Sequence, residues 1–307
     1  MANLRDISRR INSVKSTMQI TRTMEMVSTA KIRSALQRAE EAGPYKDAIT
    51  RMLANVAGSA GAAANQPLLE RHSVEDRVLF ILVASDRGLA GGFNVNPQRE
   101  VEEQIKRLEA KGVACELITC GRKPTEYFKH RDIMPVMSFE GISSEPTMDE
   151  ADRIASYIMD SYVHAGVDRV MLYYHHAKNR VDQVEVVEQV LPLDPHGFGM
   201  PNAPREGSEG MTEIQEETYS EYDFDPSAEE VLGYLIPSYI RTIVYHALLD
   251  SAAAEHGARR TAMQSATDNA ESVITNLSRT LNRVRQGSIT TELNEIVGGA
   301  SALEDEQ

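Results

Sequence analysis

A glycine-rich segment, Gly88-x-x-Gly91-Gly92, follows a continuous apolar run and is the first place where this sequence could hold a phosphate. Backbone N–H groups cradle phosphates when glycines are spaced as G-x-G-x-x-G or G-x-x-x-x-G-K-[ST]. The spacing here fits neither pattern, and no P-loop occurs elsewhere. We therefore interpret the segment as a tight turn between a strand and a loop, and predict no cofactor-binding residue.

Two residue pairs could ligate a metal ion. Cys115 and Cys120 are five positions apart on an expected strand, so their side chains face opposite sides. His175 and His176 alternate in the same way at a strand end, and no third ligand is spaced to help them. No Ser-His-Asp or Cys-His constellation stands out either. The sequence predicts no metal site and no catalytic residue, so the chain is not expected to be an enzyme.

Charge is distributed unevenly along the chain, whose formal net charge is −14. Residues 205–230 carry ten acidic residues against Arg205 alone, whereas basic residues dominate the first forty positions. Those basic residues are Arg5, Arg9, Arg10, Lys15, Arg22, Lys31, Arg33 and Arg38. They form either a solvated helix face or a surface for an acidic partner. Nucleic acid is the competing partner, but the acidic total and the lack of stacking aromatics oppose it.

Composition limits the cellular setting. No run of about 18 apolar residues occurs, so the sequence predicts no membrane-spanning helix. Two cysteines are too few for a disulfide scaffold, and the start lacks the apolar stretch of a secretory signal. We expect a soluble protein of a reducing compartment.

The first structural element that the sequence predicts is a helix over residues 1–57. Its apolar side chains recur in steps of three and four, the narrow stripe of a coiled coil. The stripe comprises Leu4, Ile7, Ile11, Val14 and Met18, continued by Thr21. After Thr21 the heptad phase of the stripe is expected to shift. The stripe then continues through Met24, Val27, Ile32, Ala35 and Ala39. Pro44 is expected to bend or interrupt the helix.

Residues 74–195 have the pattern of a small α/β domain. Arg77–Ala84 is a continuous apolar run, typical of a strand covered on both faces. Further strands are expected at 113–120 and 170–174, and a half-buried one around Val184, Val186 and Val190. Helical patterns at 101–110 and around Ile154–Tyr162 alternate with them, which predicts an inserted Rossmann-like sheet.

The last third combines a loop and a second long helix. Residues 196–226 are rich in Pro, Gly and acids and are predicted to be an exposed or disordered loop. A helix is expected over 227–300, starting after Asp225-Pro226 with Ser227 and Glu230 as a capping box, and kinked or restarted at Pro237. Its later apolar row is Val273, Leu277, Leu281 and Val284. Because isolated helices this long leave an apolar stripe exposed, the two ends are expected to pair as an antiparallel coiled coil. Periodicity alone leaves a coiled-coil spacer or dimerisation arm open.

Three segments, in order along the chain, resemble the gamma subunits of F-type ATP synthases. They are Leu4-RDISRRINSVKSTMQITRTMEMVSTAKIRSA-Leu36, Ser85-Asp86-Arg87-Gly88-Leu89-Ala90-Gly91-Gly92-Phe93-Asn94, and Glu255-HGARRTAMQSATDNAESVITNLSRTLNRVRQGSITTELNEIVGGA-Ala300. The last contains Ile289-Thr290-x-Glu292-x-x-Glu295-x-x-x-Gly299-Ala300, which fits the family's C-terminal signature.

This resemblance implies a non-catalytic rotor subunit of the central stalk. It implies partners: three alpha and three beta subunits around the paired helices, and the epsilon subunit and the ring of c subunits against the α/β domain. The chain would transmit torque between ion flow and ATP synthesis or hydrolysis, as a peripheral protein on the cytoplasmic face of a bacterial cell membrane. Small surface groups, such as the alanines of 252–270, would ease turning inside the subunit ring.

The resemblance also implies contacts with the beta subunits. It assigns them to Arg9, Arg10, Met24, Arg283, Arg285, Gln286, Thr290 and Glu292. Two other classes stay open at this point: a nucleotide-dependent enzyme, and a generic coiled-coil adaptor. The sequence does not indicate whether protons or sodium ions are coupled, nor in which direction the complex works.

Overall fold

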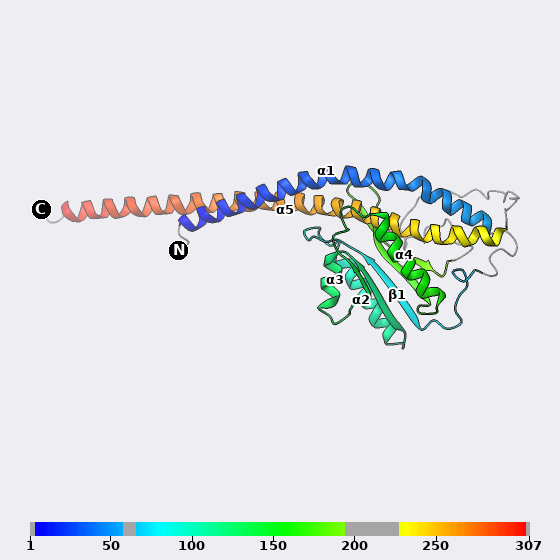
Figure 1. The fold of residues 1–307 in the computed structure, drawn as a ribbon. Helices are drawn as coiled ribbons and strands as arrows, with labels where there is room; N and C mark the ends of the chain where they lie inside the picture. The colour runs from blue at the N-terminus through cyan, green and yellow to red at the C-terminus, as the bar shows by residue number, and fades with distance from the viewer. Residues whose placement is uncertain (1–3, 58–65, 194–226, 305–307) are drawn as a thin grey trace, which may run out of the picture. The chain divides into compact units, whose positions relative to one another are not determined.

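The computed structural model describes residues 4–57, 66–193 and 227–304 (Figure 1). Two compact units are present: the helix-pair unit, residues 1–27 with 260–307, and the α/β unit, residues 28–259. Two long helices, α1 (Leu4–Ala57) and α5 (Ala228–Glu304), contribute residues to both units.

The α/β unit is built on a five-stranded sheet with the order β3-β2-β1-β4-β5. Its strands are β1 (Arg77–Val83), β2 (Ala114–Cys120), β3 (Met137–Phe139), β4 (Arg169–Ala177) and β5 (Gln183–Leu191). All neighbouring pairs are parallel except β4 with β5, which is antiparallel. Six of the seven β1 residues are buried, as expected of a central parallel strand covered on both faces.

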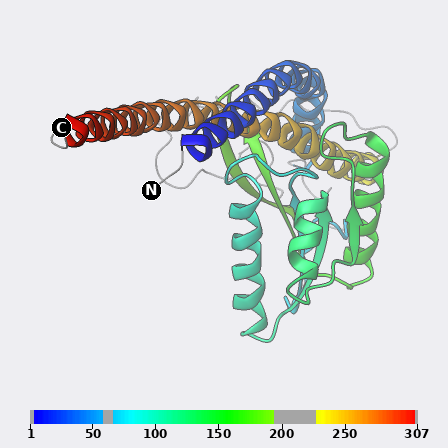
Figure 2. The ribbon, with the colours of Figure 1, turned by 90° about the vertical axis from the view of Figure 1, so that its left-hand side faces the viewer.

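Helices cover both faces of this sheet (Figure 2). Helices α2 (Val95–Glu109) and α3 (Arg122–Lys129) pack on one face, where Val101, Ile105 and Phe128 contact side chains such as Phe80 of β1. Helix α4 (Met148–Val163) covers the other face together with α1 and α5. Leu53 of α1 and Ile240 of α5 are fully buried in this larger core. The long helices are therefore part of the domain's own core.

The predicted fold class is confirmed: a long helix at each end of the chain, paired antiparallel, flanks an inserted Rossmann-like sheet. Helices α1 and α5 continue through Pro44 and Pro237, so an interruption at the first proline and a restart at the second are wrong. Helix α3 and the short strand β3 were not predicted. The Ser227 hydroxyl accepts a hydrogen bond from the Glu230 N–H, as expected of a helix cap. The predicted acidic loop at 196–226 lies outside the described residues.

The buried row on α1 keeps one heptad spacing without the predicted slip. Its fully or partly buried positions include Leu4, Ile7, Ile11, Val14, Met18, Thr21, Glu25, Ser28, Ile32 and Ala35. Val27, expected in this row, is 52% exposed, whereas Ser28 is 2% exposed. A pattern of apolar residues alone does not indicate this row, because two of its positions are polar. Ser28 fills one with a small hydroxyl group, and Glu25 fills the other with the aliphatic part of its side chain.

Candidate functional site

Within the helix-pair unit, α1 and α5 run antiparallel and side by side (Figures 1 and 2). The hydroxyls of Thr21 and Thr267 form a hydrogen bond of 2.8 Å that fixes their register. Ile7 and Ile11 of α1, with Met263 and Ala270 of α5, are buried. The buried row of α5 passes through Ile274, not through Val273 as predicted, because Val273 is 37% exposed.

The register explains where pairing stops. In an antiparallel pair, each step along α1 is matched by one step backward along α5, so from Thr21–Thr267 Leu4 falls opposite Val284. Beyond that level α5 continues to Glu304, and every described side chain from 289 to 297 is exposed. Four of these are large and apolar: Ile289, Leu293, Ile296 and Val297. The last part of α5 therefore presents apolar side chains to solvent.

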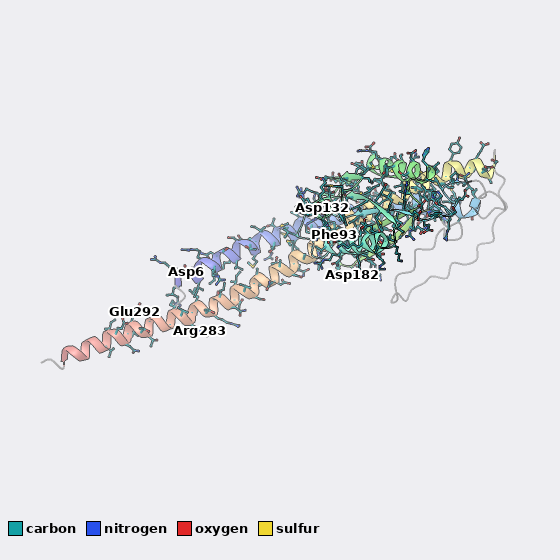
Figure 3. The ribbon with its side chains drawn as sticks, turned by 90° about the horizontal axis from the view of Figure 1, so that it is seen from below. Asp6, Phe93, Asp132, Asp182, Arg283 and Glu292 are labelled. Carbon is teal, nitrogen blue, oxygen red and sulfur yellow. The ribbon has the colours of Figure 1, made fainter. Side chains whose placement is uncertain are left out.

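The residues assigned to beta-subunit contacts all lie in this unit. Arg9 and Arg10 are exposed on α1, and Arg9 makes only a loose 3.9 Å ion pair with Asp6. Met24 is partly buried beside exposed Ile20. On α5, the remaining five are exposed along successive turns: Arg283, Arg285, Gln286, Thr290 and Glu292. Figure 3 labels Arg283 and Glu292 on the C-terminal part of α5. The structure places these residues on two neighbouring helices, and within α5 the Thr290 hydroxyl donates to the Gln286 carbonyl oxygen at 2.9 Å.

A different arrangement is found in the α/β unit, around residues 250–259 of α5. This stretch is buried on nearly all sides, including its polar residues Asp250, Glu255, His256 and Arg259. Ala253 and Ala254 pack against Ala35 of α1 and Phe93 of the loop after β1. Ala252, Ala253 and Ala254 are 5%, 2% and 0% exposed. The expectation that these alanines form a smooth outer surface is wrong, because they allow close packing inside the unit.

The loop at residues 85–94 packs against this buried stretch of α5. The Arg259 guanidinium donates to the carbonyl oxygens of Gly88 at 3.3 Å and Arg87 at 3.3 Å, and to Glu255 Oε1 at 2.6 Å. The Asn94 side-chain oxygen accepts from the Ser85 N–H at 2.9 Å. The loop therefore offers carbonyl oxygens to a cation on α5, the opposite of a phosphate cradle, which offers N–H groups. This agrees with the interpretation of the glycines as a structural turn.

Asp86 ties the same loop to the next two crossover connections. Its carboxylate accepts backbone N–H groups from Arg122 at 2.8 Å, Gly141 at 2.8 Å and Ser143 at 2.9 Å. Partial burial acts to raise the pKa of Asp86, but these three donors outweigh it and lower the pKa below its ordinary value. Asp86 is thus held ionised where β1, β2 and β3 end.

Two histidines at the end of β4 have opposite environments. His175 is buried, stacks on Phe93 at 4.4 Å, and burial lowers its pKa to about 4. His176 Nδ1 lies 2.5 Å from Asp250 Oδ2, and this hydrogen bond raises the pKa of His176. The other Asp250 oxygen accepts the Ala177 N–H at 2.9 Å. Sequence reasoning identified both histidines only as possible metal ligands, and it missed Asp250 and Arg259 because their partners are distant in the chain.

The cysteines lie as expected, with Cys115 packed against the core under α2 and Cys120 in the core on the other face. Among the described residues there is no group of three or more His, Cys, Asp or Glu side chains placed to hold a metal ion. None of the helices in the described ranges has both the length and the apolar character that crossing a membrane requires.

Comparisons with known proteins give a consistent result. A family model described as ATP synthase matches residues 3–303. The ATP synthase gamma chain of Symbiobacterium thermophilum is 40% identical over 303 residues, covering 98% of this chain and 99% of the relative. A chain from the Euglena gracilis mitochondrial ATP synthase, determined as OSCP/F1/c-ring in rotational state 3, shares the fold with a TM-score of 0.63 at 18% identity, over 98% of this chain and 94% of that chain. One from the Tetrahymena thermophila mitochondrial ATP synthase central stalk and c-ring gives 0.57 at 23% identity, over 80% and 99%. The chain therefore belongs to the ATP synthase gamma-chain family.

Proposed function

We propose that this chain is the rotating central-stalk subunit of an F-type ATP synthase and catalyses no reaction itself. It would transmit torque between the c-ring, where ions flow, and the alpha and beta subunits, where ATP is made or hydrolysed. The observation that carries this proposal is the helix-pair unit. Two paired helices resist twisting better than one, and α5 continues past the pair with apolar side chains available to a surrounding partner.

The surface of the helix pair suits a shaft inside three alpha and three beta subunits. Coupling requires asymmetry, because a shaft with threefold symmetry would present the same face to every beta subunit. One chain with exposed Arg9 and Arg10 on one helix and Glu292 on the other supplies it. Arg285 and Gln286 would hydrogen-bond to beta-subunit carboxylates in one rotary position and release them in the next.

In this role, different segments of the chain have different tasks. Residues 1–57 and 227–300 form the coiled coil, and residues 74–195 form the foot that contacts the epsilon subunit and the c-ring. Membership of the family and the predicted absence of a spanning helix support a peripheral location, on the cytoplasmic face of a bacterial cell membrane. The choice between protons and sodium ions as the coupling ion lies in other subunits.

The proposal is tested by purifying the complex through a tagged beta subunit. We expect this chain to co-purify with alpha and beta subunits and to be required for ATP-driven ion pumping. Arg285→Glu is expected to lower coupled ATP hydrolysis without preventing assembly, because it reverses a charge that meets acidic beta-subunit segments. Arg279→Glu, on the same exposed helix but outside the assigned contacts, is the matched control. Failure to co-purify, or wild-type hydrolysis and pumping by Arg285→Glu complexes, would count against the proposal.

A further inference from the structure

Helix α5 is held by polar contacts on two opposite sides where it passes through the α/β unit. One contact is made by Asp250 with the end of β4, and the other by Arg259 with the loop after β1. An α-helix turns by about 100° per residue, so nine residues place these two side chains about 180° apart. Along the axis they are separated by about 13.5 Å.

The Arg259 contact is a buried, fully directed cluster. The side chains of Arg259 and Glu255 are only 8% and 3% exposed, and their ion pair spans 2.6 Å. The Arg259 Nε–H donates to the Gly88 carbonyl oxygen, and Nη2 also lies within hydrogen-bond distance of the Arg87 and Gly88 carbonyl oxygens. The planar fork of arginine can serve a carboxylate and two carbonyls together, which the single ammonium of lysine does poorly. Breaking such a cluster leaves a buried charge without its partners.

The Asp250 contact is equally directed. Asp250 is 5% exposed at its side chain, and its two oxygens accept from the His176 ring and the Ala177 backbone. The backbone donor belongs to the sheet itself, so this contact fixes α5 to a strand and not to a movable side chain alone.

Between these contacts most of the α5 side chains are small. Ala252, Ala253 and Ala254 are buried and present little relief to the residues around them. Apolar packing is not directional, whereas hydrogen bonds weaken steeply when distance or angle changes. A rotation of α5 by about 20° would move a group about 6 Å from its axis by about 2 Å. Such a shift breaks hydrogen bonds of about 3 Å but leaves alanine packing nearly unchanged.

We propose that Asp250 and Arg259 are positioning residues that lock α5 against rotation within the α/β unit and so form the torque-bearing joint between foot and shaft. This inference rests on the proposed function. Because the two contacts lie on opposite sides, a force couple about the helix axis loads both together. Loss of one leaves a weakened joint, and loss of both leaves α5 held chiefly by its apolar packing in the larger core.

The test uses complete complexes, with alpha, beta, epsilon and c subunits, in sealed vesicles. ATP hydrolysis and ATP-driven ion uptake are measured together for the wild type, Arg259→Gln, Asp250→Asn and the double variant. We expect hydrolysis to stay within about twofold of the wild type, whereas ions pumped per ATP fall about twofold in each single variant and more in the double variant. The loss should grow as the opposing gradient builds, because a weak joint slips under load. A merely structural role would not produce this load dependence.

Arg260→Gln, at the next residue, is the matched control and should pump as the wild type does. If the double variant does not assemble, Arg259→Lys decides the question. Lysine keeps the charge beside Glu255 but lacks the planar guanidinium that bonds to the two carbonyl oxygens. In this variant, ATP hydrolysis without ion uptake is therefore expected only against a high ion gradient. Wild-type pumping ratios at every gradient, in the double variant or in Arg259→Lys if the double does not assemble, would overturn the inference. A wild-type complex that hydrolyses ATP without pumping would instead refute the proposed function.

Discussion

The side-chain oxygens of Thr21 and Thr267 lie 2.8 Å apart, although 246 residues separate the two threonines in the chain. Both occupy buried-row positions, on α1 and α5 respectively, and each hydroxyl also lies within hydrogen-bond distance of a carbonyl oxygen of its own helix, that of Met18 for Thr21 and that of Met263 for Thr267. Because a hydroxyl has one hydrogen, one threonine donates to its own helix while the other donates to the first threonine's oxygen. This contact sets the register of the helix-pair unit. The exposed stretch at 289–297 follows from that register.

A double cysteine variant tests this register. Thr21→Cys with Thr267→Cys is expected to form an intramolecular disulfide under mild oxidation, because facing side chains of a coiled-coil pair lie within bonding distance. The product is detected by its mobility on a non-reducing gel. The native thiols should not compete, since burial raises the pKa of Cys115 to about 11 and of Cys120 to about 12.

Thr23→Cys with Thr267→Cys is the control for that experiment, since Thr23 is exposed and lies about 200° around α1 from Thr21. Equal cross-linking of both pairs, or none at Thr21–Thr267, would mean that the register is different.

Gly121 and Gly112 form a matched pair for backbone strain. Both have positive φ, +111° and +83°. A Cβ at Gly121 would clash with the Ala84 backbone, whereas a Cβ at Gly112 meets nothing within 4 Å. We expect Gly112→Ala to cost about 1 kcal/mol and Gly121→Ala several times that, in free energy of unfolding measured by urea denaturation. Similar costs for the two would show that Ala84 does not approach Gly121 closely.

Asp86→Asn is expected to destabilise the α/β unit by about 1–3 kcal/mol. The amide cannot replace a carboxylate that accepts three backbone N–H groups, and its own NH2 faces those donors. Because the pKa of Asp86 is lowered by folding, its contribution is present above the ordinary carboxyl pKa and is lost as pH falls through the folded pKa. Thermal unfolding at neutral pH provides the measurement. Asp160→Asn, at an exposed position on α4, should change little, and an equal shift in both variants would contradict the assignment.

Acid should destabilise the protein through buried histidines. Burial lowers the pKa of His175, and likewise of His246 and His256, to about 4. Their stabilisation is therefore complete above the ordinary pKa of about 6.5 and is lost as pH falls from there toward 4. His176 acts in the opposite direction, because its pKa is raised.

His175→Leu removes one of these groups. Between pH 7 and pH 5 its free energy of unfolding should fall by about 2 kcal/mol less than that of the wild type. Denaturation followed by tyrosine circular dichroism at the two pH values gives the free energy of unfolding of the wild type and of His175→Leu. His130→Leu, at an exposed position, should follow the wild type. A wild-type pH dependence in His175→Leu would show that the ring is not held neutral.

Local patterns in the sequence predicted much of the fold. The continuous apolar run of β1 and the heptad row from Leu4 to Thr21 have one interpretation each, and both elements are present. The row beyond Thr21 was misjudged because polar Ser28, and not apolar Val27, is the buried residue at that level. Asp250 and Arg259 illustrate the larger limit. Their partners, Ala177 and Gly88, are 73 and 171 residues away, and no local pattern indicates which distant backbone groups a buried charge will meet.

Direct observation of rotation tests the central claim, that this chain is a rotor. A label is attached through Lys111→Cys, at an exposed turn after α2, in complexes immobilised by their beta subunits. On addition of ATP, the account predicts continuous rotation of the label in one direction. Steady ATP hydrolysis with a stationary label would contradict it.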